Sequence, residues 1–202
     1  MPQILDYLRT QEGEMLRTLA RWVNQDSPTL HKASADAMGQ MLVQAFTAEG
    51  CVLAATHPQP DFGDHYTLTF GSGSGQILLL CHFDTVWPLH EAQRRPFTVK
   101  NGVGRGPGSH DMKGGIVIAL FALRALRALN LTPGKKITLL LTSDEEVSSP
   151  TSREIIEAAG RQSNVCFVLE GSHHRSRLTT SRKGVGRFTL NVTGKAAHAF
   201  AG

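Results

Sequence analysis

Residues 77–86 read ILLLCHFDTV, an unbroken apolar run that ends in a histidine and an aspartate. Two further short apolar runs follow, ITLLLT at 137–142 and VCFVL at 165–169. Continuous apolar runs of this length are typical of parallel strands that are covered on both faces. Apolar residues recur at helical spacing between these runs, over 112–129 and 152–161. The sequence therefore predicts an α/β fold with a mostly parallel, mixed sheet flanked by helices.

The regions outside these runs add helices at the N-terminus and a change of character at the C-terminus. Apolar spacing predicts one or two amphipathic helices over 4–23 and another over 37–46. The glycine-rich segment 71–75, GSGSG, is interpreted as a hairpin loop. Apolar and polar residues alternate from Phe188 to Val192, which predicts a half-exposed antiparallel strand. We therefore expect a new unit to begin near Lys183.

The composition is that of an ordinary soluble globular protein, long enough to bury a sizeable core. Of the 202 residues, 41% are hydrophobic and 19% charged, and the net charge of +4 comes from basic residues scattered along the chain. A nucleic-acid surface would need a denser basic stripe with interleaved aromatic residues, and aromatics make up only 6%. The chain has no apolar stretch of membrane-span or signal-peptide length, so we expect no membrane partner.

The three cysteines indicate a reducing compartment. Cys51, Cys81 and Cys166 are odd in number, far apart and outside any CxxC pair. Cys81 and Cys166 stand inside apolar runs, which predicts buried free thiols. A cytoplasmic location follows as an expectation.

Ionisable residues gather where the apolar runs end. Parallel strands present their carboxyl ends at one edge of a sheet, which is where ligands bind in open α/β sheets. The candidate site residues at that edge are His82, Asp84, Asp111, Glu145, Glu146 and Glu170. The sequence therefore predicts that these six side chains converge.

Each candidate also has a simpler interpretation. His82 and Asp84 share one face of an extended segment, so Asp84 is placed to hold one ring nitrogen, although both could merely be solvated. Asp111 precedes a helix and could be its N-cap. The adjacent Glu145 and Glu146 would point in opposite directions from extended backbone, or form a solvated acidic turn. Glu170 ends an apolar strand and needs a partner to offset its desolvation.

Taken together, the set points to hydrolysis. An imidazole with three or four carboxylates and no cysteine suits Zn²⁺ or a similar divalent cation, singly or as a pair. Such a site activates a water molecule and polarises a carbonyl, and a free carboxylate can then act as general base. The sequence contains no GxxxxGK[ST], GxGxxG, GxSxG or HExxH motif, so a nucleotide site is not expected.

Five segments in order resemble the M20 family of metallopeptidases, in particular its carboxypeptidase G2-like members. They are HFDTV (82–86), GRGPGSHDMKGG (104–115), TSDEEVSS (142–149), VLEGS (168–172) and LNVTGKAAHA (190–199). The resemblance implies a zinc-dependent hydrolase that cleaves the amide bond of a peptidyl or N-acyl amino acid, with release of a C-terminal glutamate as a narrower expectation. It also implies a homodimer and a metal site that takes two Zn²⁺ ions, or another divalent ion such as Co²⁺ or Mn²⁺.

The resemblance also implies a role for each residue. His82, Asp111, Glu146 and Glu170 would bind metal, with Asp111 bridging two ions. Asp84 would orient His82, Glu145 would be the general base, and His198 would help to hold the substrate. Residues 1–182 would be the N-terminal part of the catalytic domain. Residues 183–202 would begin an inserted lid and dimerisation domain of α+β type.

One departure from the family pattern leaves two alternatives open. The family's last metal-binding histidine lies further downstream than Gly202, and the spacing of His110, His173 and His174 does not identify a substitute. The first alternative is a truncated, catalytically silent fragment with an incomplete metal site. The second is an α/β binding module that holds no metal.

Overall fold

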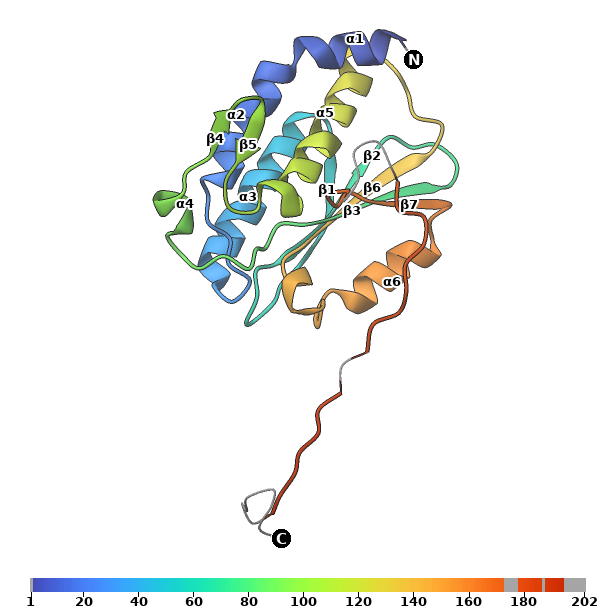
Figure 1. Cartoon of the computed structure of the whole chain (residues 1–202). Helices are drawn as coiled ribbons and strands as arrows, with labels where there is room; N and C mark the ends of the chain where they lie inside the picture. The colour runs from blue at the N-terminus through green and yellow to red at the C-terminus, as the bar shows by residue number, and fades with distance from the viewer. Residues whose placement is uncertain (1, 173–177, 187, 195–202) are drawn as a thin grey trace. The chain divides into compact units, whose positions relative to one another are not determined.

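The computed structural model describes residues 2–172, 178–186 and 188–194, which divide into two units at Gly171 and Ser172. The first unit contains the helices and strands shown in Figure 1. The helices are α1 (Pro2–Thr10), α2 (Glu12–Val23), α3 (Lys32–Ala48), α4 (Glu91–Arg94), α5 (Gly114–Ala128) and α6 (Arg153–Arg161). The strands are β1 (Val52–His57), β2 (His65–Phe70), β3 (Gln76–His82), β4 (Thr98–Lys100), β5 (Val103–Arg105), β6 (Lys136–Thr142) and β7 (Val165–Val168).

Five strands form one mixed sheet in the order β1-β2-β6-β3-β7. The three apolar runs become β6, β3 and β7, which are neighbours and parallel. Strands β1 and β2 extend the sheet in antiparallel fashion on the other side of β6. The α/β sheet predicted from the sequence is confirmed, although its parallel part is confined to three strands. A separate two-stranded ribbon joins β4 and β5.

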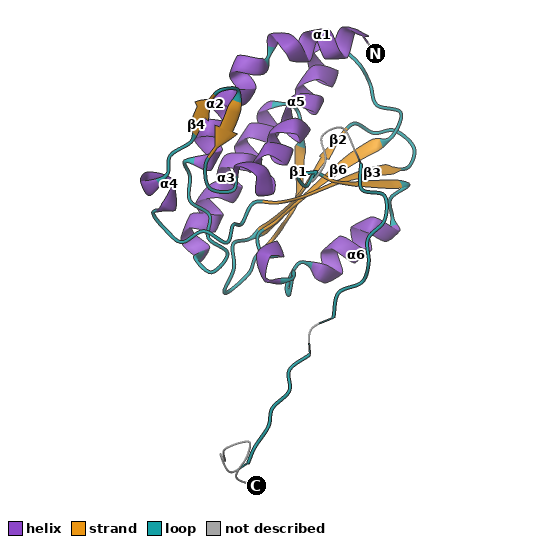
Figure 2. Cartoon of the chain, viewed as in Figure 1, coloured by secondary structure: helices purple, strands orange, loops and turns teal. Residues whose placement is uncertain are grey.

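Helices cover both faces of this sheet. Figure 2 shows α3 and α5 on one face and α6 on the other. Helix α5 buries Ile116, Leu120 and Leu123 almost completely, in a core that also contains Leu68 of β2 and Leu139 of β6. Burial of this apolar surface provides the main favourable free energy of folding, and it fixes the carboxyl ends of β3, β6 and β7 at one edge.

The segment 71–75 is not a hairpin loop, as the sequence had suggested. Strands β2 and β3 both pair with β6, which lies between them. The loop therefore passes over the start of β6, where the amide of Lys136 donates to the carbonyl oxygens of Gly73 and Gly75 at 3.2 and 3.1 Å. Strand β6 begins 66 residues after β2 ends, so the local glycine pattern could not indicate that β6 separates β2 from β3.

Strand β7 corrects the expectation of a buried Cys166. Cys51 and Cys81 are buried free thiols, but Cys166 is exposed. Cys166 is exposed because β7 is an edge strand of the sheet. The next two residues of β7, Phe167 and Val168, are also 47% and 56% exposed. An apolar run therefore indicated a strand here but did not establish that both its faces are covered.

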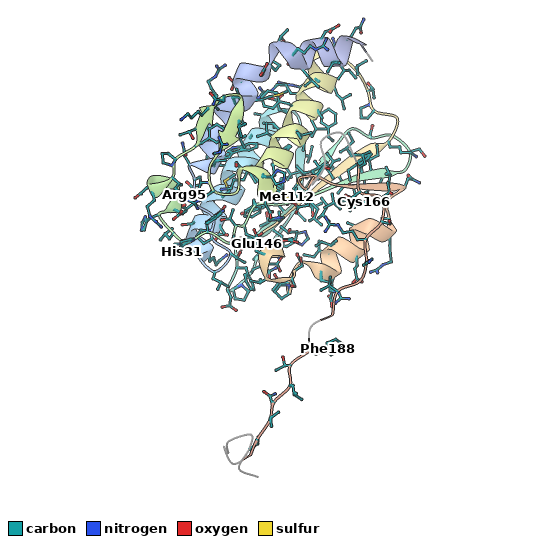
Figure 3. All side chains as sticks on the ribbon, in the orientation of Figure 1. His31, Arg95, Met112, Glu146, Cys166 and Phe188 are labelled. Carbon is teal, nitrogen blue, oxygen red and sulfur yellow. The ribbon has the colours of Figure 1, made fainter. Side chains whose placement is uncertain are left out.

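The second unit contains no helix or strand among its described residues. The strand predicted from Phe188 to Val192 is not formed, and Phe188, labelled in Figure 3, is exposed. An alternating segment needs a partner strand to complete its hydrogen bonds, and the described part of this unit supplies none. The assignment of 183–202 to a lid domain stays a prediction. None of the described helices is both long and apolar enough to cross a membrane.

Candidate metal centre

The carboxyl ends of the three parallel strands carry the candidate site. His82 is the last residue of β3 and is level with Thr142 of β6. Glu145 follows β6 in a short 3-10 turn, Glu145–Val147, and Glu170 stands two residues beyond β7. Asp111 comes from the irregular turn Ser109–Lys113 that leads into α5. The structure thus brings together residues that are separated by up to 88 positions in the sequence.

His82 lies at the centre of this group. Its ring is only 2% exposed, and Nε2 is 3.0 Å from an oxygen of Asp111 and 3.0 Å from an oxygen of Glu170. A carboxylate oxygen of Glu145 is 3.8 Å from the same nitrogen. Glu170 therefore has the partner that its position at the end of an apolar strand required.

The other ring nitrogen of His82 faces acceptors only. Nδ1 is 3.3 Å from Oδ1 of Asp84 and 3.2 Å from the backbone oxygen of the same residue. Neither atom can donate, and neither can the carboxylates that face Nε2, so both ring nitrogens carry a proton when no metal is bound. With a cation between Nε2 and those carboxylates, Nδ1 would keep its proton. The lone pair of neutral His82 then lies on Nε2, which is the nitrogen that faces Asp111 and Glu170. This is the arrangement in which a carboxylate orients a metal-binding histidine.

Asp84 is completely buried and also holds the turn after β6. Its two carboxylate oxygens accept hydrogen bonds from the backbone amides of Glu145 and Glu146, each at 3.3 Å. One carboxylate therefore fixes both the histidine ring and the backbone that carries the two glutamates.

Of the two interpretations of the glutamate pair, the backbone agrees with the acidic turn and not with the extended segment. Glu145 and Glu146 lie in a 3-10 turn and not in extended backbone, so they do not point to opposite sides of a strand. Asp144 causes this: its buried carboxylate accepts four hydrogen bonds, from the backbone amides and hydroxyl groups of Thr151 and Ser152, at 2.6 to 3.0 Å. The sequence analysis gave Asp144 no role, because its donors Thr151 and Ser152 follow it only after seven and eight residues.

Asp111 is not a helix N-cap. Helix α5 begins after Lys113, and no side chain caps it. The peptide bond between Asp111 and Met112 is cis. The carboxylate of Asp111 contacts His82 instead, which excludes the capping alternative for this residue.

Lys113 is a second residue that the sequence analysis did not single out. Its side chain is 1% exposed, and Nζ donates to the backbone oxygens of Trp22 at 3.0 Å and Gln25 at 2.7 Å. Burial lowers the pKa of this amine to about 7. Lys113 therefore ties the end of α2 to the turn that carries Asp111.

The accumulated negative charge shifts the pKa values of the site. Burial alone would lower the pKa of His82, but hydrogen bonds to Asp111, Asp84 and Glu170 outweigh it and raise the pKa to about 12. The hydrogen bond to His82 lowers the pKa of Asp111. Burial, and then the charge of Asp111, raise the pKa of Glu146 to about 7, and burial also raises the pKa of Glu145. Carboxylates this crowded favour a cation among them.

The donor set fits a divalent metal ion. Two groups of three residues each place one ligand atom per residue within 4.8 Å of the others: His82 with Glu145 and Glu170, and His82 with Asp111 and Glu146. Oxygen and imidazole ligands without cysteine suit Zn²⁺ and its neighbours. Glu146 is labelled in Figure 3. Glu145 was expected to act only as the general base, but its carboxylate also belongs to one of the two groups of possible metal ligands.

Among the described residues, no histidine other than His82 belongs to a ligand group. His110 belongs to neither of the two ligand groups found among the described residues. His173, His174 and His198 lie outside the described residues. The expected substrate contact of His198 therefore stays a prediction, as do the individual roles of the converging residues.

A cavity of about 370 Å³ adjoins the site. Glu146 and Thr29 form part of its wall, and most of the remaining wall is apolar, including Leu30, Val86 and Trp87. A small molecule seated beside the carboxylates would therefore meet an apolar surface on one side.

Comparison with known proteins places this geometry in a family. Residues 78–192 match the model of peptidase family M20/M25/M40. The chain is 33% identical over 130 residues to carboxypeptidase G2 of Pseudomonas sp. (strain RS-16), covering 64% of this chain and 31% of that protein. It is 33% identical over 134 residues to acetylornithine deacetylase of Buchnera aphidicola subsp. Schizaphis graminum, covering 64% and 34%. The chain thus spans about a third of the length of these curated relatives.

Solved structures show the same fold. Human carnosine dipeptidase 1 superposes with a TM-score of 0.72 at 19% identity, covering 82% of this chain and 40% of that one. The M20 metallo-carboxypeptidase Sso-CP2 of Sulfolobus solfataricus gives a TM-score of 0.59 at 18% identity, covering 77% and 37%. Because the family model matches more than half of its residues, the chain belongs to peptidase family M20/M25/M40.

Proposed function

We propose that this chain carries the metal-binding half of a zinc-dependent hydrolase that cleaves the amide bond of a peptidyl or N-acyl amino acid. The observation that supports it most is the orientation of His82. Asp84 holds Nδ1, and Nε2 faces carboxylates from the ends of neighbouring strands. A solvated surface cluster would not bury the imidazole at 2% exposure with its acceptors arranged on both nitrogens.

The proposed division of roles follows the positions of the side chains. His82, Asp111, Glu146 and Glu170 would hold the metal, with Asp111 shared if two ions are bound. A bound divalent cation would polarise the substrate carbonyl and lower the pKa of water toward neutrality. Glu145 would take a proton from the attacking water and pass it to the leaving nitrogen, a role suited to a carboxylate whose pKa is raised by burial. The apolar wall of the adjoining cavity would contact the acyl side of the substrate.

Three finer features of the proposal follow from other observations. The similarity to carboxypeptidase G2 supports the release of a C-terminal glutamate. The free state of Cys51, Cys81 and Cys166 supports a reducing compartment such as the cytoplasm. The division of the chain at Gly171 and Ser172 supports a separate C-terminal unit, within which residues 183–202 would begin a lid and dimerisation domain in a homodimer.

The first test substitutes the proposed base. Glu145→Gln should lower the hydrolysis of an N-acyl glutamate by about 10²- to 10⁴-fold, because the amide cannot accept the proton. Zinc content after dialysis, measured by atomic emission, should stay close to that of the wild-type chain. Glu154→Gln, which removes an exposed carboxylate on α6, serves as the control and should change neither quantity.

The same assay separates the alternatives. Wild-type turnover that survives Glu145→Gln would contradict the assigned role of Glu145. A wild-type chain that binds about one zinc ion and shows no turnover would support the silent fragment, and a chain that binds no zinc at all would support a binding module.

A further inference from the structure

Residues 27–29, which follow α2, pair with residues 83–85 just beyond the end of β3, beside the candidate metal centre. Pro28 forms a parallel bridge with Thr85. The amide of Thr85 donates to the backbone oxygen of Ser27 at 2.9 Å, and the amide of Thr29 donates to that of Thr85 at 3.3 Å. The hydroxyl of Ser27 donates to the backbone oxygen of Phe83 at 2.6 Å. Residues 27–29 are thus fixed against residues 83–85, on either side of Asp84.

Thr29 makes the shortest hydrogen bond to the carboxylate of Asp84. Its hydroxyl oxygen is 2.8 Å from Oδ2, whereas His82 Nδ1 and the amides of Glu145 and Glu146 are each 3.3 Å from a carboxylate oxygen. Thr29 is 5% exposed and Asp84 is fully buried, so water does not replace these donors readily. Among the described residues, Thr29 is the one donor to this carboxylate that does not belong to the proposed site itself.

We propose that Thr29 is a positioning residue for the metal centre. Its hydroxyl holds Asp84 in the one orientation that serves His82 and the turn at Glu145 and Glu146 at the same time. This inference rests on the proposed function, because it takes His82, Glu145 and Glu146 as residues of a metal site. The hydrogen bonds themselves are present without a metal. A short N-terminal segment, 53 residues before His82, thereby controls the geometry of ligands on two other elements, β3 and the 3-10 turn.

The physical argument is that a buried carboxylate keeps its orientation only while its donors are complete. Without the Thr29 hydroxyl, Oδ2 retains a single long bond, from the amide of Glu146. A buried acceptor that loses its best donor is destabilised, and the side chain can rotate to seek another. Rotation of Asp84 would release the His82 ring and both amides together. Loss of a partner of this kind typically weakens metal affinity 10- to 100-fold.

The experiment compares Thr29→Val with Thr138→Val as a matched control. Thr138 lies on β6, is also 5% exposed, and its hydroxyl likewise donates to one buried oxygen, Oε1 of Gln76 at 2.9 Å. The two variants therefore lose the same group at equal burial, but only one lies against Asp84. Thr29→Ser should restore the wild-type behaviour because it keeps the hydroxyl.

Two readouts are taken. The first is amide hydrogen exchange at Glu145 and Glu146 in the metal-free protein, measured by NMR, which should be about tenfold faster in Thr29→Val and unchanged in Thr138→Val and Thr29→Ser. The second is the zinc dissociation constant by competition with a chromophoric chelator, which should rise about tenfold or more in Thr29→Val alone. If the valine variant does not fold, Thr29→Ser and Thr29→Ala are compared, since they differ only by the hydroxyl.

The outcomes distinguish this inference from the proposed function. Exchange at both amides that is as slow in Thr29→Val as in the wild type would overturn the inference, whether or not zinc binds. Equal acceleration in Thr138→Val would overturn it too, because the effect would then be general loss of stability. A wild-type chain that binds no zinc, with exchange still faster in Thr29→Val, would overturn the proposed function and support the positioning role.

Discussion

Individual side chains behind the metal centre explain why its geometry is fixed before any ion binds. His65 shows how far this organisation extends. The amide of Ser143 donates to Nδ1 of His65 at 3.2 Å, so the proton of the neutral ring is on Nε2, which is 2.9 Å from the hydroxyl of Thr151. That hydroxyl donates to Asp144 at 2.8 Å. A neutral histidine thus supports the hydrogen bonds that shape the glutamate turn.

This network predicts a pH dependence of stability. Burial lowers the pKa of His65 despite the nearby charge of Asp144, so the folded chain resists a proton that the unfolded chain accepts near pH 6.5. The contribution of His65 is therefore complete above pH 6.5 and is lost as the pH falls below that value. Urea unfolding from pH 8 to pH 5 should show a decline that is smaller in His65→Asn, which cannot titrate. An identical decline in both proteins would contradict this assignment.

At the scale of elements, one glycine sets how closely α5 approaches the end of β7. A Cβ on Gly115 would lie 1.8 Å from the backbone oxygen of Leu169, the residue before Glu170. Gly160 of α6 offers the opposite case, because a Cβ there would have no heavy atom within 4 Å.

Alanine at these two positions should therefore have opposite effects. Gly115→Ala should lower the free energy of unfolding by about 1 to 3 kcal/mol through overpacking against β7. Gly160→Ala should raise it by about 0.5 to 1 kcal/mol, since alanine favours the helix. Chemical denaturation of both variants measures the difference. Stabilisation by both substitutions would mean that α5 does not approach β7 as closely as described.

Elements differ in how well the sequence predicted them. The helices over 4–23 and 37–46 and the parallel strands depend on local apolar spacing, and all of them were found. Strand β2 was missed although Tyr66 and Leu68 are buried and alternate with less buried threonines. Strand β1 gave less signal because most of it is exposed.

The candidate site, like the elements, was predicted from the sequence only in part. Convergence of His82 with Glu145 and Glu170 follows from the rule that parallel strands end at one edge. The 3-10 turn and the contact between Thr29 and Asp84 do not, because they depend on bonds between residues 55 or more positions apart, or on the buried Asp144. No local pattern determines such contacts.

At the scale of the whole molecule, the β7 edge of the sheet exposes apolar side chains. Strand β7 pairs with β3 on one side, and Val165, Phe167 and Val168 are 39% to 56% exposed. An apolar edge strand of this kind promotes association between copies.

Phe167→Lys should therefore reduce concentration-dependent association, measured by sedimentation velocity, because a charged residue on an edge strand opposes edge-to-edge pairing. Gln162→Lys adds the same charge at the end of α6 and should leave association unchanged. Equal reduction by both variants would show that net charge alone controls association.

The order of strands in the sheet also has a consequence for synthesis. Strand β6 lies between β2 and β3 but follows them by more than 50 residues in the sequence. Once β2 and β3 have left the ribosomal exit tunnel, more than 50 further residues must be added before β6, which joins them, leaves it too. For several seconds at ordinary rates of translation, the nascent chain therefore carries β3 without any partner strand and β2 paired only with β1. During that interval a chaperone would bind these exposed strands. The interval ends when Leu139 and its neighbours in β6 leave the exit tunnel.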